Sequence, residues 1–207
     1  MIHRFSPEIL TLIQHIHHRY PALDLGRGED WKLELDGVTS SLIPGKRPLV
    51  VRYMTPAQEA EGTIRRAESL LQAQTTATTA VLVIDPIRLG EYTAQAELIC
   101  SSYCLIAGRD DIAQLRYRRR SLVLAAAEFV GGMQFDIVVI SGLFDVRLGS
   151  FQSGHQLRRL LSLLYLAISR ARGLVELHIC ETDGGLPEVL SSAVGNGTLW
   201  EATHPIH

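Results

Sequence analysis

The sequence predicts an α/β fold of three layers, in which a mostly parallel sheet lies between helices. Short apolar segments alternate with longer amphipathic segments along most of the chain, which is typical of parallel strands joined by right-handed helical crossovers. Residues 81–84 are continuously apolar, as expected of a strand buried on both faces. Residues 157–168 place leucines three and four positions apart, as expected of a buried helix face.

Length and composition indicate one domain without a general attraction for nucleic acid. The chain has 207 residues, 46% of them hydrophobic, and a formal net charge of −2. We expect a single domain over residues 1–207, with its core at about 4–194 and a tail at 195–207 that forms a hairpin or a loose end. The three cysteines lack zinc-type spacing, and no apolar run is long enough to cross a membrane. These features predict a cytoplasmic protein without a metal site.

The first predicted helix runs from Pro7 to about Tyr20. Ser6 is suited to cap it, Pro7 suits its first position, and the acidic Glu8 is favoured in its first turn. Residues 21–48 are rich in Gly, Pro, Asp and Ser and predict a loop with room for one edge strand around residues 31–35.

The remaining elements alternate. A helix capped at Thr55 is expected to reach about Gln74. Gly173 is expected to separate the helix over 157–168 from a strand over 174–179. A further helix is expected at residues 92–100, and further strands at 49–53, 103–107, 121–126 and 136–141. In such sheets ligands bind beyond the carboxyl ends of the strands.

Two segments resemble parts of nucleotide-binding motifs but lack the required residues. Before Gly45-Lys46-Arg47, Ser40 stands where a phosphate-binding loop needs glycine, and Arg47 stands where it needs a magnesium-binding Ser or Thr. Asp85 follows the apolar run as a Walker B acid would, but Pro86 replaces the second acid. We interpret Asp85 as a turn residue.

Two later segments carry a more specific resemblance. Residues 165–172 read YLAISRAR, and residues 132–139 read GMQFDIVV. They resemble the motifs Y-V-A-x-T/S-R-A-R and K-G-L-E-F-D-x-V of the second RecA-like domain of superfamily 1 helicases of the UvrD/Rep/PcrA type. Residues 2–9, IHRFSPEI, resemble motif IV of the same proteins. The resemblance extends from Arg4 to about Val194 and implies a RecA-like (P-loop NTPase-like) domain without its own Walker A loop.

The resemblance assigns roles to four residues. Arg170 corresponds to the arginine finger, which reaches a triphosphate held by another domain and neutralises charge that develops during hydrolysis. Arg4, Gln134 and Gly132 correspond to nucleotide-binding positions. From the residues alone, two alternatives stay open: Arg170 and Arg172 can complement the negative end of a helix dipole, and Arg4 can be an ordinary exposed arginine.

Candidate nucleic-acid contacts are Arg116, Arg118, Arg119 and Glu128. The three arginines belong to the basic cluster at 116–120, which suits a phosphate backbone but also suits a solvated loop. Ala126, Glu128 and Gly131 stand where the family has threonine, histidine and lysine. A carboxylate in place of these groups is expected to weaken DNA binding.

The resemblance implies half of a two-domain motor. We expect an N-terminal RecA-like helicase domain as partner, in the same chain or another, and single-stranded or partly duplex DNA as ligand. ATP and Mg²⁺ are expected in the complete enzyme, whereas this chain alone should bind no cofactor and not hydrolyse ATP. The alternative is a degenerate helicase-like domain that serves as a non-catalytic protein-interaction module. A flavodoxin-like enzyme is disfavoured because the sequence has no G-x-G-x-x-G fingerprint.

Overall fold

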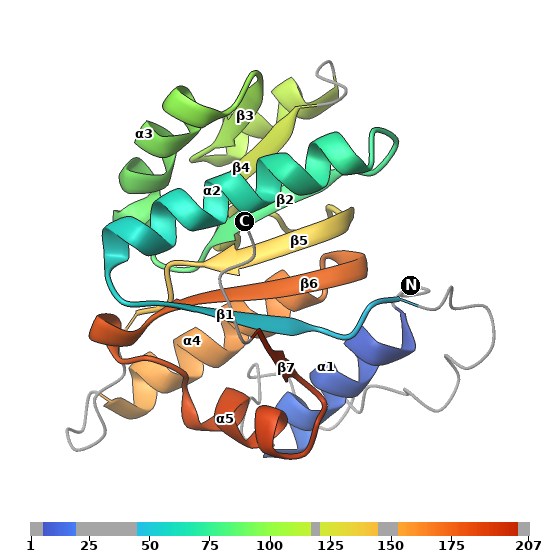
Figure 1. Ribbon diagram of the computed structural model, residues 1–207, viewed down its shortest axis with the longest axis vertical. Coiled ribbons are helices and arrows are strands. Elements are labelled where there is room, and N and C mark those ends of the chain that lie inside the picture. The colour runs from blue at the N-terminus through green and yellow to red at the C-terminus, as the bar shows by residue number, and fades with distance from the viewer. Residues whose placement is uncertain (1–5, 20–44, 117–120, 145–152, 203–207) are drawn as a thin grey trace.

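The computed structural model describes residues 6–19, 45–116, 121–144 and 153–202. Their strands form one seven-stranded sheet in the order β3-β4-β2-β5-β6-β1-β7, and every pairing is parallel (Figure 1). The strands are β1 (Leu49–Tyr53), β2 (Thr79–Val83), β3 (Tyr103–Ile106), β4 (Leu122–Ala126), β5 (Phe135–Ser141), β6 (Ala171–Cys180) and β7 (Trp200–Glu201).

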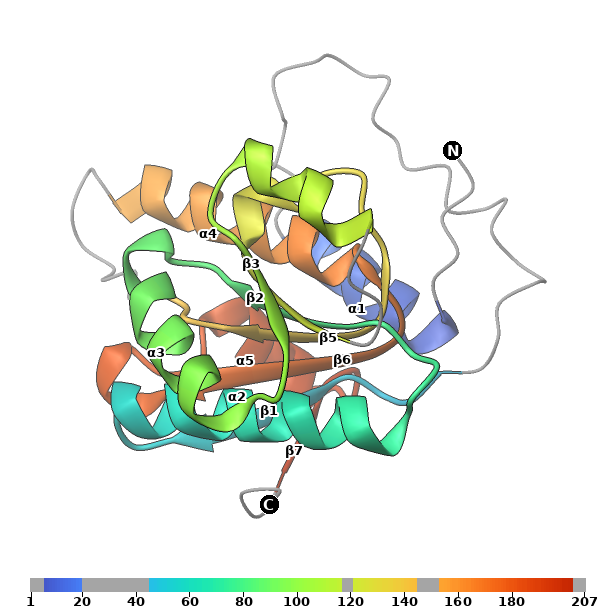
Figure 2. The same ribbon diagram turned by 90° about the horizontal axis from the view of Figure 1, so that it is seen from above.

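Helices cover both faces of this sheet. The α-helices are α1 (Pro7–Arg19), α2 (Pro56–Ala73), α3 (Leu89–Ile99), α4 (Ser153–Ile168) and α5 (Glu188–Gly195). Short 3-10 helices are η2 (Pro86–Arg88), η3 (Arg109–Arg116), η4 (Ala127–Phe129) and η5 (Glu181–Asp183). Helices α2 and α3 lie on one face, and α1, α4 and α5 lie on the other (Figures 1 and 2). The predicted three-layer α/β fold is confirmed.

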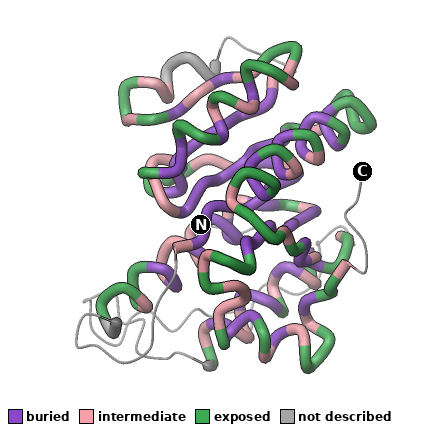
Figure 3. Tube along the Cα trace, turned by 60° about the vertical axis from the view of Figure 1, so that its left-hand side comes forward, coloured by how far each residue is buried: buried purple, intermediate pink, exposed green. Residues whose placement is uncertain are grey.

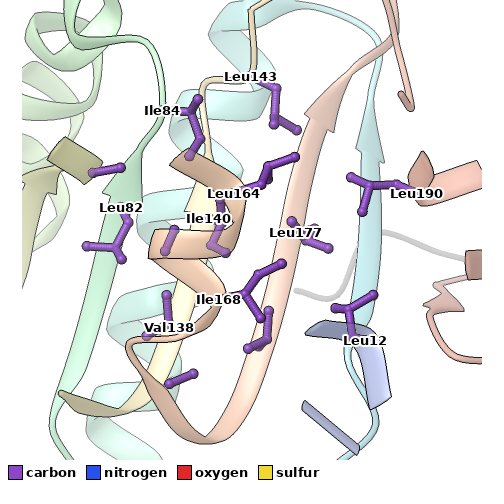
Figure 4. Close-up of a cluster of buried hydrophobic side chains, with 14 of the residues drawn as sticks. Leu12, Leu82, Ile84, Val138, Ile140, Leu143, Leu164, Ile168, Leu177 and Leu190 are labelled. Carbon is purple, nitrogen blue, oxygen red and sulfur yellow. The ribbon is translucent and has the colours of Figure 1, made fainter. Parts of the chain in front are cut away.

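The strands divide their side chains between two cores. In β5, Val138 and Ile140 pack under α1, α4 and α5, whereas Ile137 and Val139 pack under α2 and α3. This alternation follows from the pleat of a strand, and it explains why the central strands are apolar at almost every position. Figure 3 shows the central strands buried along their length, and Figure 4 shows the core that includes Val138 and Ile140.

The expected helix starts are present. The Ile9 N–H donates to the Ser6 hydroxyl at 3.4 Å, and the Gln58 N–H donates to the Thr55 hydroxyl at 3.3 Å. Asp85 forms the expected turn, because its carboxylate accepts the Ile87 N–H at 3.1 Å at the start of η2. Each cap satisfies a backbone donor that the first turn of a helix leaves free.

One local prediction is wrong. Gly173 does not separate α4 from a later strand, because β6 already begins at Ala171. Phe135 pairs with Ala171 and Ile137 with Leu174, so β6 accommodates one extra residue as a bulge between these pairs.

The tail is also different from the prediction. It does not form a hairpin: Trp200 donates its N–H to the Pro48 carbonyl at 2.9 Å, and β7 extends the sheet in parallel beside β1. The free edge of β1 supplied a partner that sequence alone did not indicate.

Other expectations concern cysteines, metals and membranes. Cys100, Cys104 and Cys180 are free thiols. Among the described residues, no group of His, Cys, Asp or Glu is arranged to hold a metal ion. No described helix combines the length and the hydropathy needed to cross a bilayer. The possible edge strand around residues 31–35 lies outside the described residues.

Candidate functional site

The two resemblance motifs meet at the amino edge of the sheet, where the parallel strands begin. Arg170 lies between the end of α4 and the start of β6, and Met133 and Gln134 directly precede β5. Since β5 and β6 are neighbours, these residues lie side by side. The expectation that a ligand would lie beyond the carboxyl ends therefore does not apply to these candidates, because both motifs end against the start of a strand.

Neutral groups hold the Arg170 guanidinium in place. Its Nη1 donates to the Met133 carbonyl at 3.3 Å, and its Nη2 donates to the Ser169 hydroxyl at 2.9 Å. Its Nε donates to the Leu166 carbonyl at 3.2 Å. The side chain is half-buried, and this burial lowers the pKa of Arg170 because desolvation penalises its charged form.

Arg170 forms no ion pair with any residue in the described part of the chain. Its positive charge is therefore oriented by carbonyl and hydroxyl oxygens without being neutralised there, which suits it to an incoming anion. The bond to Leu166 also fits the alternative in which Arg170 caps the negative end of α4. Both interpretations use the same position at the edge of the sheet.

Gln134 is partnered by a different arginine. The Arg172 Nε donates to the Gln134 side-chain oxygen at 3.2 Å, and the Arg172 Nη1 lies 3.8 Å from an Asp136 carboxylate oxygen. Asp136 in turn accepts the Thr78 N–H at 2.8 Å and the Thr78 hydroxyl at 2.9 Å. Sequence reasoning gave Arg172 no role of its own, although the helix-end position that pointed to Arg170 also brings Arg172 to this edge.

The structure brings together some of the remaining candidates and separates others. Gly132 adopts a φ of +81° in the turn before β5, a conformation that favours glycine. Glu128 is exposed in η4, beyond the carboxyl end of β4, and so lies at the opposite edge from Arg170. Glu128 therefore lies apart from Arg170, Gly132 and Gln134.

Four basic candidates cannot be placed by their side chains. Arg4, Arg118 and Arg119 lie outside the described residues, and Arg116 ends η3 with its side chain undescribed. Two residues after Arg4, however, the Ser6 N–H donates to the Arg172 carbonyl at 3.0 Å. The described start of the chain therefore lies beside β6 at the amino edge.

A buried charged network occupies the carboxyl edge, and sequence reasoning missed it. Glu59 is 0% exposed, and one of its carboxylate oxygens lies 2.7 Å from Arg88 Nη1. Its other oxygen accepts the Ser141 hydroxyl at 2.9 Å and the Gly142 N–H at 3.0 Å. Burial and the Glu59 charge raise the pKa of Tyr92, whose hydroxyl lies 2.8 Å from the Ser141 oxygen. Glu59 thus ties α2 to the ends of β2 and β5.

One signal in the sequence pointed to this network. Glu59 precedes Thr63 by four residues and Ala67 by eight, so all three share the buried face of α2. A carboxylate on such a face requires a buried partner, and Arg88 provides it.

The same face of the sheet carries a second buried carboxylate, Glu176 in β6. Arg66 donates from Nη2 to one Glu176 carboxylate oxygen at 2.7 Å and from Nε to the other at 2.9 Å. His178 Nε2 lies 3.5 Å from the second of these oxygens. The Thr63 hydroxyl lies 2.9 Å from His178 Nδ1 on the other side of the ring. Burial opposes the ionisation of Glu176, but its interactions with His178 and Arg66 outweigh burial and lower its pKa to about 2.

Glu176 should make the stability of the fold depend on pH under acidic conditions. Since its pKa is lower in the folded chain than in the unfolded chain, its stabilising contribution is complete above about pH 4.5 and is lost as the pH falls toward 2. The free energy of unfolding should fall by about 2 kcal/mol more in the wild type than in Glu176→Gln between about pH 6 and pH 3. Urea titrations at both pH values measure this difference, and equal losses in the two proteins would contradict it.

Comparison with known proteins places the fold. No family model matches the sequence, and no curated protein matches it. The C-terminal domain of a possible DNA helicase from Lactobacillus plantarum WCFS1 is similar with a TM-score of 0.62 and 17% identity, over 97% of this chain and 99% of that one. The chain shares the fold of that C-terminal domain.

A second solved structure is much less similar. Flagellar accessory protein FlaH from Methanocaldococcus jannaschii matches with a TM-score of 0.35 and 9% identity, over 84% of this chain and 78% of that one. The three-layer architecture with its parallel sheet is consistent with a RecA-like domain.

Proposed function

We propose that this chain is the second RecA-like domain of a superfamily 1 DNA helicase of the UvrD/Rep/PcrA type. It supplies Arg170 as arginine finger to a triphosphate bound by an N-terminal RecA-like domain. The observation that carries the proposal is the Arg170 guanidinium, held by neutral oxygens at the amino edge beside Met133 and Gln134. The shared fold and the motifs at 132–139 and 165–172 support it.

Arg170 is chemically suited to this role. Hydrolysis of a nucleoside triphosphate develops negative charge on the transferred group, and a correctly placed guanidinium stabilises that charge. The bonds to Met133 and Ser169 fix the orientation of the planar group before a ligand arrives, so less ordering is needed during the reaction. Arg4, Gly132 and Gln134 are proposed contacts of the same nucleotide.

The other domain must supply the phosphate loop, which this sequence lacks. The bound ATP would bring its phosphates and Mg²⁺, and the phosphate loop of the other domain would hold them. In this proposal DNA lies across both domains of a cytoplasmic enzyme. The arginines of the 116–120 cluster and Glu128 would contact the strand.

Joining the two domains tests the proposal. The chain alone should hydrolyse no ATP, because it has no Walker A motif among its 207 residues. Hydrolysis should appear when the chain is joined to an N-terminal RecA-like domain that carries the phosphate loop, and DNA should stimulate it. DNA-stimulated hydrolysis by the chain alone, measured by phosphate release, would refute the proposal.

A non-catalytic protein-interaction module is the second candidate. The residues Ala126, Glu128 and Gly131, which replace the threonine, histidine and lysine of the family, favour it. In that case the joined enzyme would turn over ATP without any dependence on Arg170.

A further inference from the structure

An exposed tryptophan stands beside an arginine at the amino edge. Trp200 is the first residue of β7 and remains 54% exposed. The guanidinium carbon of Arg47 lies over its ring, 4.9 Å from the centroid. This contact is a cation–π interaction, and it leaves a large part of the aromatic surface open to a ligand.

Further cations continue from this pair along the same edge. Lys46 and Arg47 are exposed just before β1, and the Lys46 N–H donates to the Gly173 carbonyl of β6 at 3.1 Å. Arg172 is exposed at the start of β6. We name Arg172, Lys46, Arg47 and Trp200 the amino-edge row. It crosses β6, β1 and β7, which spans about 10 Å at the usual spacing of neighbouring strands.

The carboxylates near the row are already engaged. Glu201 binds Arg52, which also binds Glu181. Glu8 accepts the Gly45 N–H at 3.0 Å. Burial opposes the ionisation of Glu8, but its hydrogen bonds and the charge of Arg47 outweigh burial and lower its pKa. Asp136 faces Arg172 but also binds Thr78.

The three cations of the row thus outnumber the two carboxylates, Asp136 and Glu8, that interact with Arg172 and Arg47 among the described residues. The surface is suited to an anionic ligand with a flat ring.

We propose that the amino-edge row binds single-stranded nucleic acid. One base stacks on Trp200, and successive phosphates lie along Arg47, Lys46 and Arg172. A strand fits better than a single phosphate group because the cations are spread over three strands of the sheet. Stacking and backbone charge carry little sequence information, so binding should tolerate different sequences. The inference rests on the proposed function in so far as it adds a contact for the strand of that enzyme, at the edge opposite Glu128, to the contacts proposed above.

Tryptophan fluorescence provides a direct test. The chain has two tryptophans, and Trp31→Phe leaves Trp200 as the sole emitter. An oligothymidylate of about twelve nucleotides should quench this emission at low salt, without ATP or another domain. Trp200→Ala, measured by anisotropy of the labelled oligonucleotide in the otherwise unchanged chain, should weaken binding by about 5- to 100-fold.

Charge variants show whether binding depends on the cations of the row or on nonspecific electrostatic attraction. Lys46→Ala and Arg47→Ala should each weaken binding and reduce the salt dependence of the affinity by about one unit of slope. Arg65→Ala is the matched control, because Arg65 is an exposed arginine on α2 that pairs with Glu61 away from the row. It should leave affinity and salt dependence nearly unchanged.

Three outcomes would overturn the inference. These are an unquenched Trp200, an affinity insensitive to Trp200→Ala, and binding of AMP as tight as binding of the oligonucleotide. Any of them could occur while ATP hydrolysis by the joined enzyme still depends on Arg170, so the proposed function would survive. Conversely, strand binding that depends on Trp200, with hydrolysis independent of Arg170, would overturn the proposed function and leave this inference standing.

Discussion

Arg170→Ala should lower the kcat of the joined two-domain enzyme by about 10³- to 10⁵-fold, the range typical of a lost arginine finger. The guanidinium stabilises charge that develops in the transition state, and an alanine leaves that charge without its donor. The KM for ATP should change far less, because the phosphate loop of the other domain supplies most of the ground-state binding. Steady-state phosphate release at saturating ATP and DNA measures both constants.

Two further measurements make this result specific. Arg170→Lys keeps a positive charge but loses the planar fork that Met133 and Ser169 orient, so it should recover only part of the lost rate. Circular dichroism should show that both variants remain folded. Full turnover by Arg170→Ala would contradict the motor interpretation and favour the protein-interaction module.

Glu59→Ala should lower the free energy of unfolding by about 3–5 kcal/mol. The substitution leaves the buried Arg88 without its closest carboxylate and deprives Ser141 and Gly142 of their acceptor. The Gly142 N–H then loses its acceptor, and the largely buried Arg88 keeps only the more exposed Glu91 and Asp183, at 3.2 Å and 3.4 Å. Urea unfolding of the isolated chain measures the loss.

Glu61 provides the matched control on the same helix. It is an exposed glutamate in α2, two residues after Glu59, and it pairs with Arg65. Glu61→Ala removes the same side chain at a solvated position and should cost about 0.5 kcal/mol or less. Similar losses in the two variants would show that Glu59 contributes no more than a surface ion pair.

The sequence predicted the layers because each layer leaves a local pattern. The uninterrupted apolar residues 80–83 of β2 reflect burial on both faces, and the cap at Thr55 marks the start of α2. What it could not show depends on partners distant in the chain. β7 exists because β1, 151 residues earlier in the chain, offers a free edge, and the bulge near Gly173 lies where β6 pairs with β5.

In the candidate site, too, local patterns were predictable and contacts between distant residues were not. Arg170 and Gln134 were found from local motifs, and parallel topology brought their segments to one edge. The structure supplied the immediate partners: Gln134 contacts Arg172 instead of Arg170, and Glu128 lies at the opposite edge. Hydrogen bonds between side chains 38 residues apart leave no periodic trace in a sequence.

The central claim is that Arg170 stabilises the transition state of a reaction whose substrate another domain holds. Its most direct test is the affinity of the joined enzyme for ADP–aluminium fluoride, an analogue of the transferring phosphoryl group, measured beside its affinity for a non-hydrolysable ATP analogue. Arg170→Ala should weaken binding of the first by at least about 100-fold and of the second by only a few-fold. Equal affinities of wild type and variant for ADP–aluminium fluoride would contradict it.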